Sequence, residues 1–377
     1  MRIVMATEFI PPKDKGFSGG AEARTYYLAK ALSKKHDVTM VSSYLPGTER
    51  EEEIDGVPTV RVGPMREYTQ RGSFVARRDY IRSLARTIPS LEPDIVDGSG
   101  FVSWDGSFKA ARASGARAVM SVMEVWRGEW VRNMGLFNGM IGNLLERRYF
   151  ARPYDRYVSI SKFTRDKMVK VFDIPPEKID VIYCGVDMQT FDDVMVKDKY
   201  PEPTLCTVCR LVHYKRVQDV LRAMALLSDS HPTLRYKIVG RGKFEGQLNK
   251  LARELGLTDR VEFLGRVKTN EELIRIMKRS HVFVLPSIVE GFGMVVLEAM
   301  ACRVPYVASA IPPVREVTQG GKGGYLFNPM DERDLANKLD QALASKTDGH
   351  DFVVENYRWE SLAEELERVY LNIGGNG

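Results

Sequence analysis

Short apolar runs alternate along the chain with longer segments whose apolar residues recur at helical spacing. The first run covers residues 2–6, a helical segment follows at about 21–35, and a second run covers residues 37–42. Short and nearly continuous apolar strands are typical of a parallel sheet that helices cover on both faces. The pattern therefore predicts a βαβ unit at the start of the chain. Further strands are expected at residues 59–62, 94–96, 118–122, 157–160 and 180–182.

The alternation is interrupted between residues 187 and 203, where acidic residues, lysines and prolines replace the apolar pattern. We interpret this segment as a linker between domains. After it the alternation of strand and helix resumes, and right-handed crossovers predict a second doubly wound sheet. Its strands are expected at residues 204–211, 235–239, 261–264, 282–286, 304–308 and 325–327. A last segment with helical spacing covers residues 359–371.

A length of 377 residues and a mass of 42.7 kDa suit two domains of ordinary size. We expect an α/β protein with two Rossmann-like domains, at residues 1–190 and 195–355. In open parallel sheets, ligands bind beyond the carboxyl ends of the strands. Functional residues are therefore expected directly after strands. Two such domains facing each other would form a ligand cleft between them.

The composition narrows the class of protein. With 44% hydrophobic and 28% charged residues the chain is globular, and its net charge of +5 does not favour nucleic-acid binding. No apolar run reaches the roughly 18–20 residues of a membrane-spanning helix. The chain starts with a strand-like segment, so we expect no secretory signal. The four cysteines show no disulfide spacing, and we expect a reducing, cytoplasmic location.

Positive charge is concentrated in two stretches of the first domain. Such clusters are either solvated helix faces or contacts for anionic lipid, and the sequence leaves both open. Apolar residues between 134 and 150 precede the second cluster, which suits a basic amphipathic surface at the inner face of the cell membrane or a core helix. The clustered arginines are Arg66, Arg71, Arg77, Arg78, Arg82 and Arg86, and then Arg147, Arg148, Arg152 and Arg156.

The densest group of candidate functional residues lies at residues 286–300. A predicted strand ends there, a glycine-containing turn follows, and a helix is expected to begin near Gly293. Free amides at the start of a helix bind anions and suit a diphosphate. Glu290 precedes the helix and Glu298 lies within it, and a fully helical spacing of this length would separate them by roughly 12 Å. Two carboxylates so spaced can hold different hydroxyl groups of one elongated ligand. A buried capping glutamate with a surface glutamate is the alternative.

This segment, Ser-x-x-Glu-Gly-Phe-Gly-Met-Val-x-Leu-Glu-Ala-Met-Ala, resembles the E-x7-E signature of family-four retaining glycosyltransferases of the group 1 type, which have the GT-B fold. The resemblance covers nearly the whole chain and is strongest between residues 204 and 329. It implies a first domain that binds the acceptor, a second that binds a nucleotide sugar, and a C-terminal helix at 357–373 that packs back on the first domain. Further motifs agree in order: Gly19-Gly20-Ala21-Glu22, Arg210-Leu-x-x-x-Lys215, Val239-Gly240-x-Gly242 and Phe263-Leu-Gly-Arg266-Val267.

The resemblance also implies a role for each motif residue. Glu298 would hold the donor ribose and Glu290 the transferred sugar, while Arg210 and Lys215 would bind the diphosphate. With Glu290, these two cations would serve catalysis, since charge develops on the phosphate oxygen of the leaving group. An ordinary surface pair is the alternative for Arg210 and Lys215 taken alone. The remaining donor-site residues would be Gly19 and Gly20 near the diphosphate, Gly293, Met294 and Val295 through their amides, and Arg266 and Val267 near the base.

We expect no metal and no other cofactor, because the nucleotide sugar is itself a substrate. The five histidines lack the spacing of metal ligands and no Asp-x-Asp occurs. The resemblance also implies a metal-free site.

Several positions depart from the family pattern. Relatives commonly have a histidine, thought to contact the donor sugar and assist catalysis, where this chain has Met123. Methionine cannot donate or accept a proton there, so Met123 weakens the case for catalysis more than the case for donor binding. The acceptor-side candidates are Met123, Glu124, Trp126 and Trp130. Smaller departures, mostly where glycine is usual, are Arg216, Arg303, Pro312 and Pro313.

The sequence therefore predicts a retaining glycosyltransferase that moves a hexose-type sugar from a nucleotide-diphosphate sugar to a lipid-linked or surface-glycan acceptor. An anionic membrane surface is a further expected partner, and nucleic acid is not. Two alternatives share the fold: a nucleotide-sugar epimerase or isomerase, and a non-catalytic subunit that binds nucleotide sugar. The base and sugar of the donor are not readable from these residues.

Overall fold

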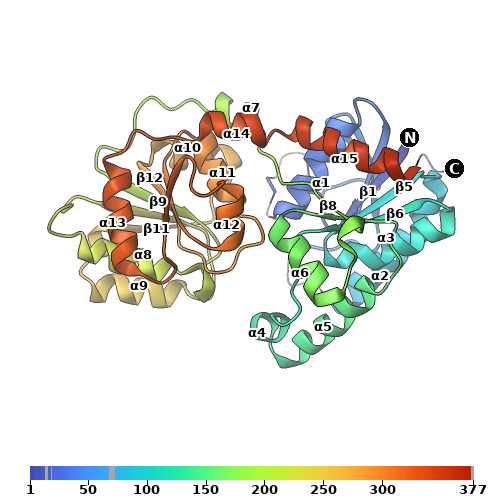
Figure 1. The fold of residues 1–377 in the computed structure, drawn as a ribbon, viewed down its shortest axis with the longest axis horizontal. Coiled ribbons are helices and arrows are strands. Elements are labelled where there is room, and N and C mark those ends of the chain that lie inside the picture. The colour runs from blue at the N-terminus through green and yellow to red at the C-terminus, as the bar shows by residue number, and fades with distance from the viewer. Residues whose placement is uncertain (13–15, 18, 68–72, 375–377) are drawn as a thin grey trace. The chain divides into compact units, whose positions relative to one another are not determined.

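The computed structural model describes residues 1–12, 16–17, 19–67 and 73–374. Two compact units make up the chain, Met1–Gly185 with the C-terminal segment from Trp359, and Val186–Arg358. Each unit has its own sheet, with helices on both faces (Figure 1).

In unit 1 the described residues form an eight-stranded sheet of order β3-β4-β2-β1-β5-β6-β7-β8. The strands are parallel except for β3 and β4, which pair antiparallel. Every strand expected in this half of the chain is present. The strands are β1 (Arg2–Thr7), β2 (Asp37–Ser43), β3 (Glu51–Ile54), β4 (Val57–Val62), β5 (Ile95–Ser99), β6 (Arg117–Val122), β7 (Arg156–Ser159) and β8 (Ile179–Val181).

The two faces of this sheet are buried by different helices. Val4, Val96 and Ala118 lie in register and form one core with α2, α3, α5 and α6. On the other face, α1 packs against the C-terminal α15, and the Tyr370 hydroxyl of α15 donates a 2.6 Å hydrogen bond to Asp97 of β5. The helices are α1 (Gly20–Leu32), α2 (Phe74–Thr87), α3 (Phe101–Ser114), α4 (Trp130–Met134), α5 (Leu136–Phe150), α6 (Lys162–Phe172) and α15 (Trp359–Gly374), with 3₁₀ turns at Ile88–Leu91 and Pro176–Lys178.

Strand β3 is absent from the sequence prediction. It contains three consecutive glutamates, a residue type that is depleted in strands. A tight turn at Asp55 and Gly56, both at positive φ, returns the chain to β4. The edge position leaves the glutamates room to reach water, and Glu52 accepts a 2.7 Å hydrogen bond from the buried Arg61 of β4.

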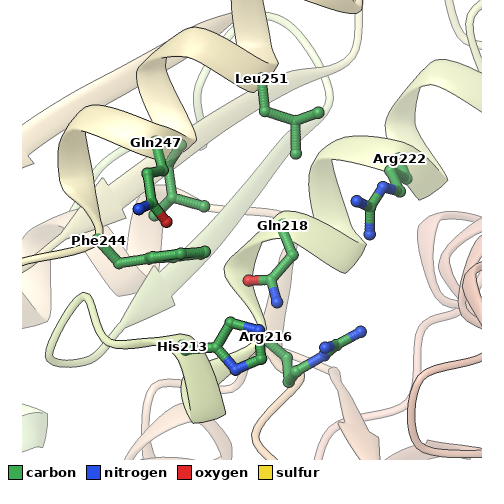
Figure 2. Close-up of a pocket in the computed structure, with 8 residues that line it drawn as sticks. His213, Arg216, Gln218, Arg222, Phe244, Gln247 and Leu251 are labelled. Carbon is green, nitrogen blue, oxygen red and sulfur yellow. The ribbon is translucent and has the colours of Figure 1, made fainter.

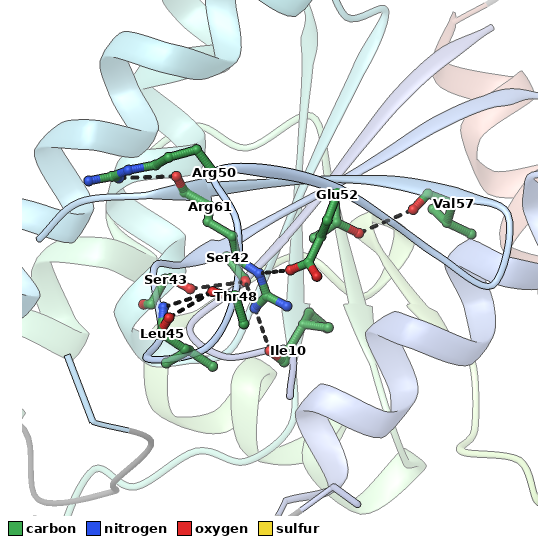
Figure 3. A network of polar contacts seen from close by, with 10 residues as sticks. Ile10, Ser42, Ser43, Leu45, Thr48, Arg50, Glu52, Val57 and Arg61 are labelled. Carbon is green, nitrogen blue, oxygen red and sulfur yellow. Dashed lines mark hydrogen bonds and ion pairs between the residues drawn. The ribbon is translucent and has the colours of Figure 1, made fainter. Parts of the chain in front are cut away.

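Arg61 also anchors the segment that follows β1. Its guanidinium donates to the Ile10 carbonyl and, at 2.8 Å, to Ser42 Oγ (Figure 3). These bonds fix the edge of the sheet and the start of the connection that leads to Gly19 and Gly20. Burial lowers the pKa of Arg61 from its ordinary value, and the Glu52 carboxylate opposes this shift.

In unit 2 the described strands form a six-stranded parallel sheet of order β11-β10-β9-β12-β13-β14. Helices α8, α9 and α13 share a core with one face of it. The short α7 lies within the segment interpreted as a linker. The strands are β9 (Thr204–Val208), β10 (Arg235–Val239), β11 (Val261–Gly265), β12 (Val282–Leu285), β13 (Tyr306–Ser309) and β14 (Gly324–Phe327). The helices are α7 (Met188–Asp193), α8 (Val217–Leu226), α9 (Glu245–Glu254), α10 (Asn270–Arg279), α11 (Met294–Ala301), α12 (Pro312–Val317), α13 (Glu332–Leu343) and α14 (His350–Asn356), with 3₁₀ turns at His213–Lys215 and Thr258–Arg260.

Candidate functional site

The predicted donor-site residues of unit 2 follow three strands, β9, β11 and β12, of four that are neighbours in the sheet. Strands β11, β10, β9 and β12 are parallel and adjacent, so their carboxyl ends meet at one edge of the sheet. Arg210 comes two residues after the end of β9, Arg266 directly after β11, and Glu290 a few residues after β12. The topology thus gathers these residues at the edge where open parallel sheets bind ligands.

Two glycines after β10 allow this segment to pack closely against the connection after β9. A Cβ atom at Gly240 would come 1.9 Å from the Cys209 carbonyl oxygen, and one at Gly242 would come 2.0 Å from that of Leu211. The amide of Leu211 donates to the Arg241 carbonyl at 3.0 Å, so the chain after β9 runs along the chain after β10. The Gly-x-Gly spacing therefore serves a backbone contact that holds Arg210 in place.

The connections after β9 and β12 meet through a charged pair. Lys215 Nζ lies 2.6 Å from Glu290 Oε1, and each side chain is only 13% exposed. The Ile288 amide donates a 3.0 Å hydrogen bond to the Tyr214 carbonyl, which joins the same two segments through the backbone. The structure thus brings together two of the three predicted catalytic residues.

Tyr214 is a site residue that the sequence analysis did not single out. Its hydroxyl accepts a 3.1 Å hydrogen bond from Arg210 Nη2, and its ring centroid lies 5.8 Å from Lys215 Nζ. It therefore contacts both predicted diphosphate-binding cations. Its position between Arg210 and Lys215 in the Arg-Leu-x-x-x-Lys motif is the sequence feature that could have identified it as a site residue.

Helix α11 begins as the motif predicts. Gly293 precedes it at φ +95°, a left-handed conformation that favours glycine. Met294 and Val295 then form the first turn, where backbone amides precede the intrahelical hydrogen bonds and are available to an anion. These amides lie in the same connection as Glu290.

Glu298 lies on α11 and is partly buried. Burial raises the pKa of its carboxyl to about 7. Within the described part of the chain, no side chain forms a hydrogen bond or ion pair with it. The Ser287 hydroxyl, in the connection between β12 and α11, is also buried without a hydrogen-bond partner among the described residues. Both groups can accept hydrogen bonds from the hydroxyl groups of a ligand.

Two departures from the family pattern have a common conformation. Arg216 and Arg303, which stand where glycine is usual, have φ of +53° and +56°. This left-handed conformation explains the usual glycine. Arg216 is held there by Asp219, whose carboxylate accepts two 2.8 Å hydrogen bonds from the guanidinium.

The predicted residues of unit 1 lie at the carboxyl ends of its strands. Gly19 and Gly20 stand at the start of α1, which follows β1. The three atoms nearest to a Cβ atom placed at Gly19 all belong to the Glu22 side chain, the first at an ordinary 3.5 Å. The fold alone therefore does not require glycine at position 19, which leaves room for a ligand to approach the backbone. Met123 and Glu124 directly follow β6 and are partly buried.

Trp126 and Trp130 are held by a buried carboxylate on α5 that the sequence analysis did not identify. Glu146 accepts 2.8 Å hydrogen bonds from the Trp126 amide and from Trp130 Nε1. The two indole rings lie 5.1 Å apart, and Trp130 packs at 4.8 Å on Phe101 of the core-facing α3. Burial raises the pKa of Glu146 above its ordinary value. The sequence feature that could have identified Glu146 is the presence of an acidic residue within the apolar stretch 134–150.

Only some arginines of the two clusters are exposed at the surface, and others are held in ion pairs. Arg66 and Arg77 both pair with Glu8 at 3.0 Å, and Arg156 pairs with Asp180 at 2.7 Å. Arg152 pairs with Asp105. Arg71 lies outside the described residues. The exposed members are Arg78, Arg82, Arg86, Arg147 and Arg148.

The described residues contain neither a metal-ligand cluster nor a membrane-spanning helix. No group of three His, Cys, Asp or Glu side chains is arranged as metal ligands there. No described helix combines the length and apolar character needed to cross a membrane.

Comparison with known proteins agrees with this arrangement. The model of "Glycosyltransferase Family 4" matches residues 18–190, and that of "Glycosyl transferases group 1" matches residues 192–359. Together these matches span most of both units. The chain belongs to the group 1 glycosyltransferases.

Known relatives and solved structures match this glycosyltransferase over nearly its whole length. An uncharacterized glycosyltransferase of Methanocaldococcus jannaschii is 26% identical, covering 98% of each chain. Sucrose-phosphate synthase of Thermosynechococcus elongatus has a similar structure, with a TM-score of 0.83 at 20% identity over all of both chains. The Anabaena protein HepE, solved in complex with UDP-glucose, has a TM-score of 0.74 at 16% identity, covering 98% of this chain and 99% of that one. The predicted GT-B fold is confirmed.

Proposed function

We propose that this glycosyltransferase moves a hexose-type sugar from a nucleotide-diphosphate sugar to a lipid-linked or surface-glycan acceptor, with retention of anomeric configuration. The observation that carries the proposal is the Lys215–Glu290 pair beside the first turn of α11. It combines a cation and helix amides for a diphosphate with a carboxylate for sugar hydroxyls. The complex of HepE with UDP-glucose makes uracil the first base to test.

Each residue then has a defined task. Arg210 and Lys215 stabilise the negative charge that develops on the leaving phosphate oxygen. The backbone amides of Met294 and Val295 contribute to the same stabilisation. Glu290 accepts hydrogen bonds from the sugar and Glu298 from the ribose. Arg266 and Val267 contact the base, and Gly19 and Gly20 allow the backbone to approach the diphosphate.

In a retaining transfer without a protein nucleophile, the acceptor oxygen attacks the face from which the diphosphate departs. The bond from the anomeric carbon to the phosphate oxygen breaks, and the bond to the acceptor oxygen forms on the same face. The acceptor proton passes to the departing phosphate oxygen, so no protein base is needed. This route tolerates Met123, because a histidine at that position would orient the sugar and not remove a proton.

The surface of α4 and α5 supports a lipid-linked acceptor. Leu136, Phe137, Met140 and Leu144 form one stripe of α5 and are 61% to 76% exposed. Arg147 and Arg148 lie exposed at the end of the same helix. Apolar residues beside arginines suit the interface of an anionic membrane. We therefore propose peripheral binding at the inner face of the cell membrane.

The stereochemistry of the product tests this proposal. NMR of the glycoside formed from an α-linked nucleotide sugar should show an α-linkage at the earliest time points. Transfer should persist in EDTA, since the proposed site uses no metal. A β-linked product would overturn the retaining mechanism. Loss of transfer in EDTA with rescue by a divalent ion would overturn metal independence.

A further inference from the structure

A cavity of about 260 Å³ lies in unit 2 between α8 and α9, and its lining residues have no part in the donor site proposed above. His213, Arg216, Gln218 and Arg222 line one side, and Phe244 and Gln247 line the other with two leucines of α9 (Figure 2). Its volume falls just below the range of about 300–1,000 Å³ for drug-sized ligands. The cavity therefore suits a ligand the size of a single ring.

Gln218 gives the first indication of what this ligand is. Its side chain lines the cavity, is 5% exposed, and has no hydrogen-bond partner for Oε1 among the described residues. A buried polar atom without a partner costs about 1–3 kcal/mol. The terminal amide torsion of glutamine is broad, so this amide can turn to meet a ligand. A hydroxyl group can accept from its nitrogen and donate to its oxygen.

The charges around the cavity are nearly balanced. Arg216 is held by the buried Asp219, and Arg222 lies 3.2 Å from Glu332 and 3.7 Å from Asp219. Two guanidinium groups thus supply hydrogen-bond donors, while two carboxylates cancel their net charge. Such a lining favours a neutral ligand rich in hydroxyl groups over a polyphosphate.

The opposite wall is mainly apolar, since Phe244 and two leucines outnumber Gln247 there. The ring of Phe244 stands edge-on to that of His213, with centroids 5.4 Å apart, and the Phe244 amide is fixed by a 3.0 Å hydrogen bond to the Leu211 carbonyl. An aromatic ring opposite polar side chains is a combination that suits a sugar ring, which has apolar C–H faces and a polar edge.

We propose that this cavity is a second carbohydrate site, which holds one neutral hexose-sized unit with a hydroxyl on Gln218 and a ring face on Phe244. The site goes beyond the proposed transfer reaction and does not depend on it. His213 also belongs to the 3₁₀ turn that ends at Lys215, so the cavity adjoins the connection that carries the Lys215–Glu290 pair. The sugar is either a free monosaccharide or one unit of a longer glycan.

Saturation-transfer NMR on the full chain tests the site. The probes are glucose, galactose, mannose and N-acetylglucosamine, each alone and as the terminal unit of a trisaccharide. The variants are Gln218→Leu and Phe244→Ala, with Gln341→Leu on the exposed face of α13 as the matched control. Gln218→Leu should fold normally, because the buried Oε1 has no hydrogen-bond partner to lose among the described residues.

We expect at least one probe to be saturated by the wild-type protein, with the signal reduced at least fivefold in Gln218→Leu and Phe244→Ala and kept in Gln341→Leu. Stronger binding of the trisaccharide identifies a glycan as the source, and equal binding identifies a free sugar. The absence of saturation for every probe overturns the proposal. So does a signal that Gln218→Leu leaves unchanged, since the sugar then binds elsewhere.

Discussion

Lys215 Nζ and Glu290 Oε1 are 2.6 Å apart, within a part of unit 2 where both side chains are largely shielded from water. The proposed function assigns Lys215 to the diphosphate and Glu290 to the transferred sugar, on the two sides of the bond that breaks. An incoming diphosphate therefore competes with Glu290 for the same cation. Two charged side chains that are shielded from water interact more strongly than a pair at the surface. Replacing Lys215 or Glu290 should therefore also change the electrostatic environment of the remaining partner.

The raised pKa of Glu298 predicts a pH-dependent donor affinity. Ribose hydroxyls donate to a carboxylate, so the donor prefers the ionised form of Glu298, which becomes abundant as the pH rises through about 7. The affinity for a nucleotide sugar should increase from pH 6 to pH 8, by at most about tenfold per pH unit. Calorimetry with an intact nucleotide sugar measures this, since its diphosphate does not titrate near neutral pH. Glu298→Gln should remove the dependence, and an unchanged dependence in that variant would assign it to another group.

Arg216 predicts a contrast between two left-handed arginines. Arg216→Gly relieves about 1 kcal/mol of backbone strain but leaves the buried Asp219 without its close partner, which costs about 3–5 kcal/mol. Urea denaturation should show a loss of about 2–4 kcal/mol in the free energy of unfolding. Arg303 has the same backbone conformation with an exposed guanidinium, 3.9 Å from Asp348. Arg303→Gly should therefore be neutral or slightly stabilising, and equal losses in both variants would contradict this account.

Most of the fold could be predicted from the chain, because buried parallel strands leave short apolar runs between helical segments. Strand β3 could not, since its glutamates follow from its place at the edge and not from burial. The signature motifs led to Arg210, Lys215 and Glu290. Their contacts with Tyr214 and with each other depend on how the connections after β9 and β12 pack.

Charge clusters were harder to interpret. A count of arginines does not distinguish Arg66, which is bound to Glu8 beneath the surface, from Arg82, which faces water. The difference depends on residues far away in the sequence. Similarly, Glu146 could not be linked to Trp126 and Trp130 before the packing of α4 on α5 was known.

The stripe on α5 predicts membrane binding. Phe137→Ser with Met140→Ser should reduce co-sedimentation with vesicles that contain anionic lipid, because both side chains are exposed and apolar. Leu226→Ser, at an exposed apolar position of α8, is the matched control and should bind as the wild type does. Binding should fall as salt rises, since exposed charges are screened over about 10 Å at 0.1 M. Equal binding by all three proteins would exclude the stripe as the membrane contact, and no binding by any of them would favour an acceptor that is not held in a membrane.

Met123 predicts a gain of activity. Met123→His restores the side chain that is usual after this strand and should increase the rate of transfer. Donor affinity should stay within about tenfold, or 1.4 kcal/mol, of the wild type. Initial rates and calorimetry measure the two effects separately. A lower rate in the variant would mean that methionine belongs to a differently shaped sugar pocket.

The central claim is that Lys215 binds the diphosphate of a nucleotide sugar. A calorimetric screen of UDP-, GDP- and ADP-sugars first identifies the donor, and the same titration is then made with Lys215→Ala and with Lys250→Ala, an exposed lysine of α9, as the control. Lys215→Ala should weaken binding of the nucleotide sugar by about 1.5–3 kcal/mol and leave binding of the free nucleoside unchanged. Equal losses for nucleoside and nucleotide sugar, or no binding of any nucleotide sugar to the wild-type protein, would contradict it.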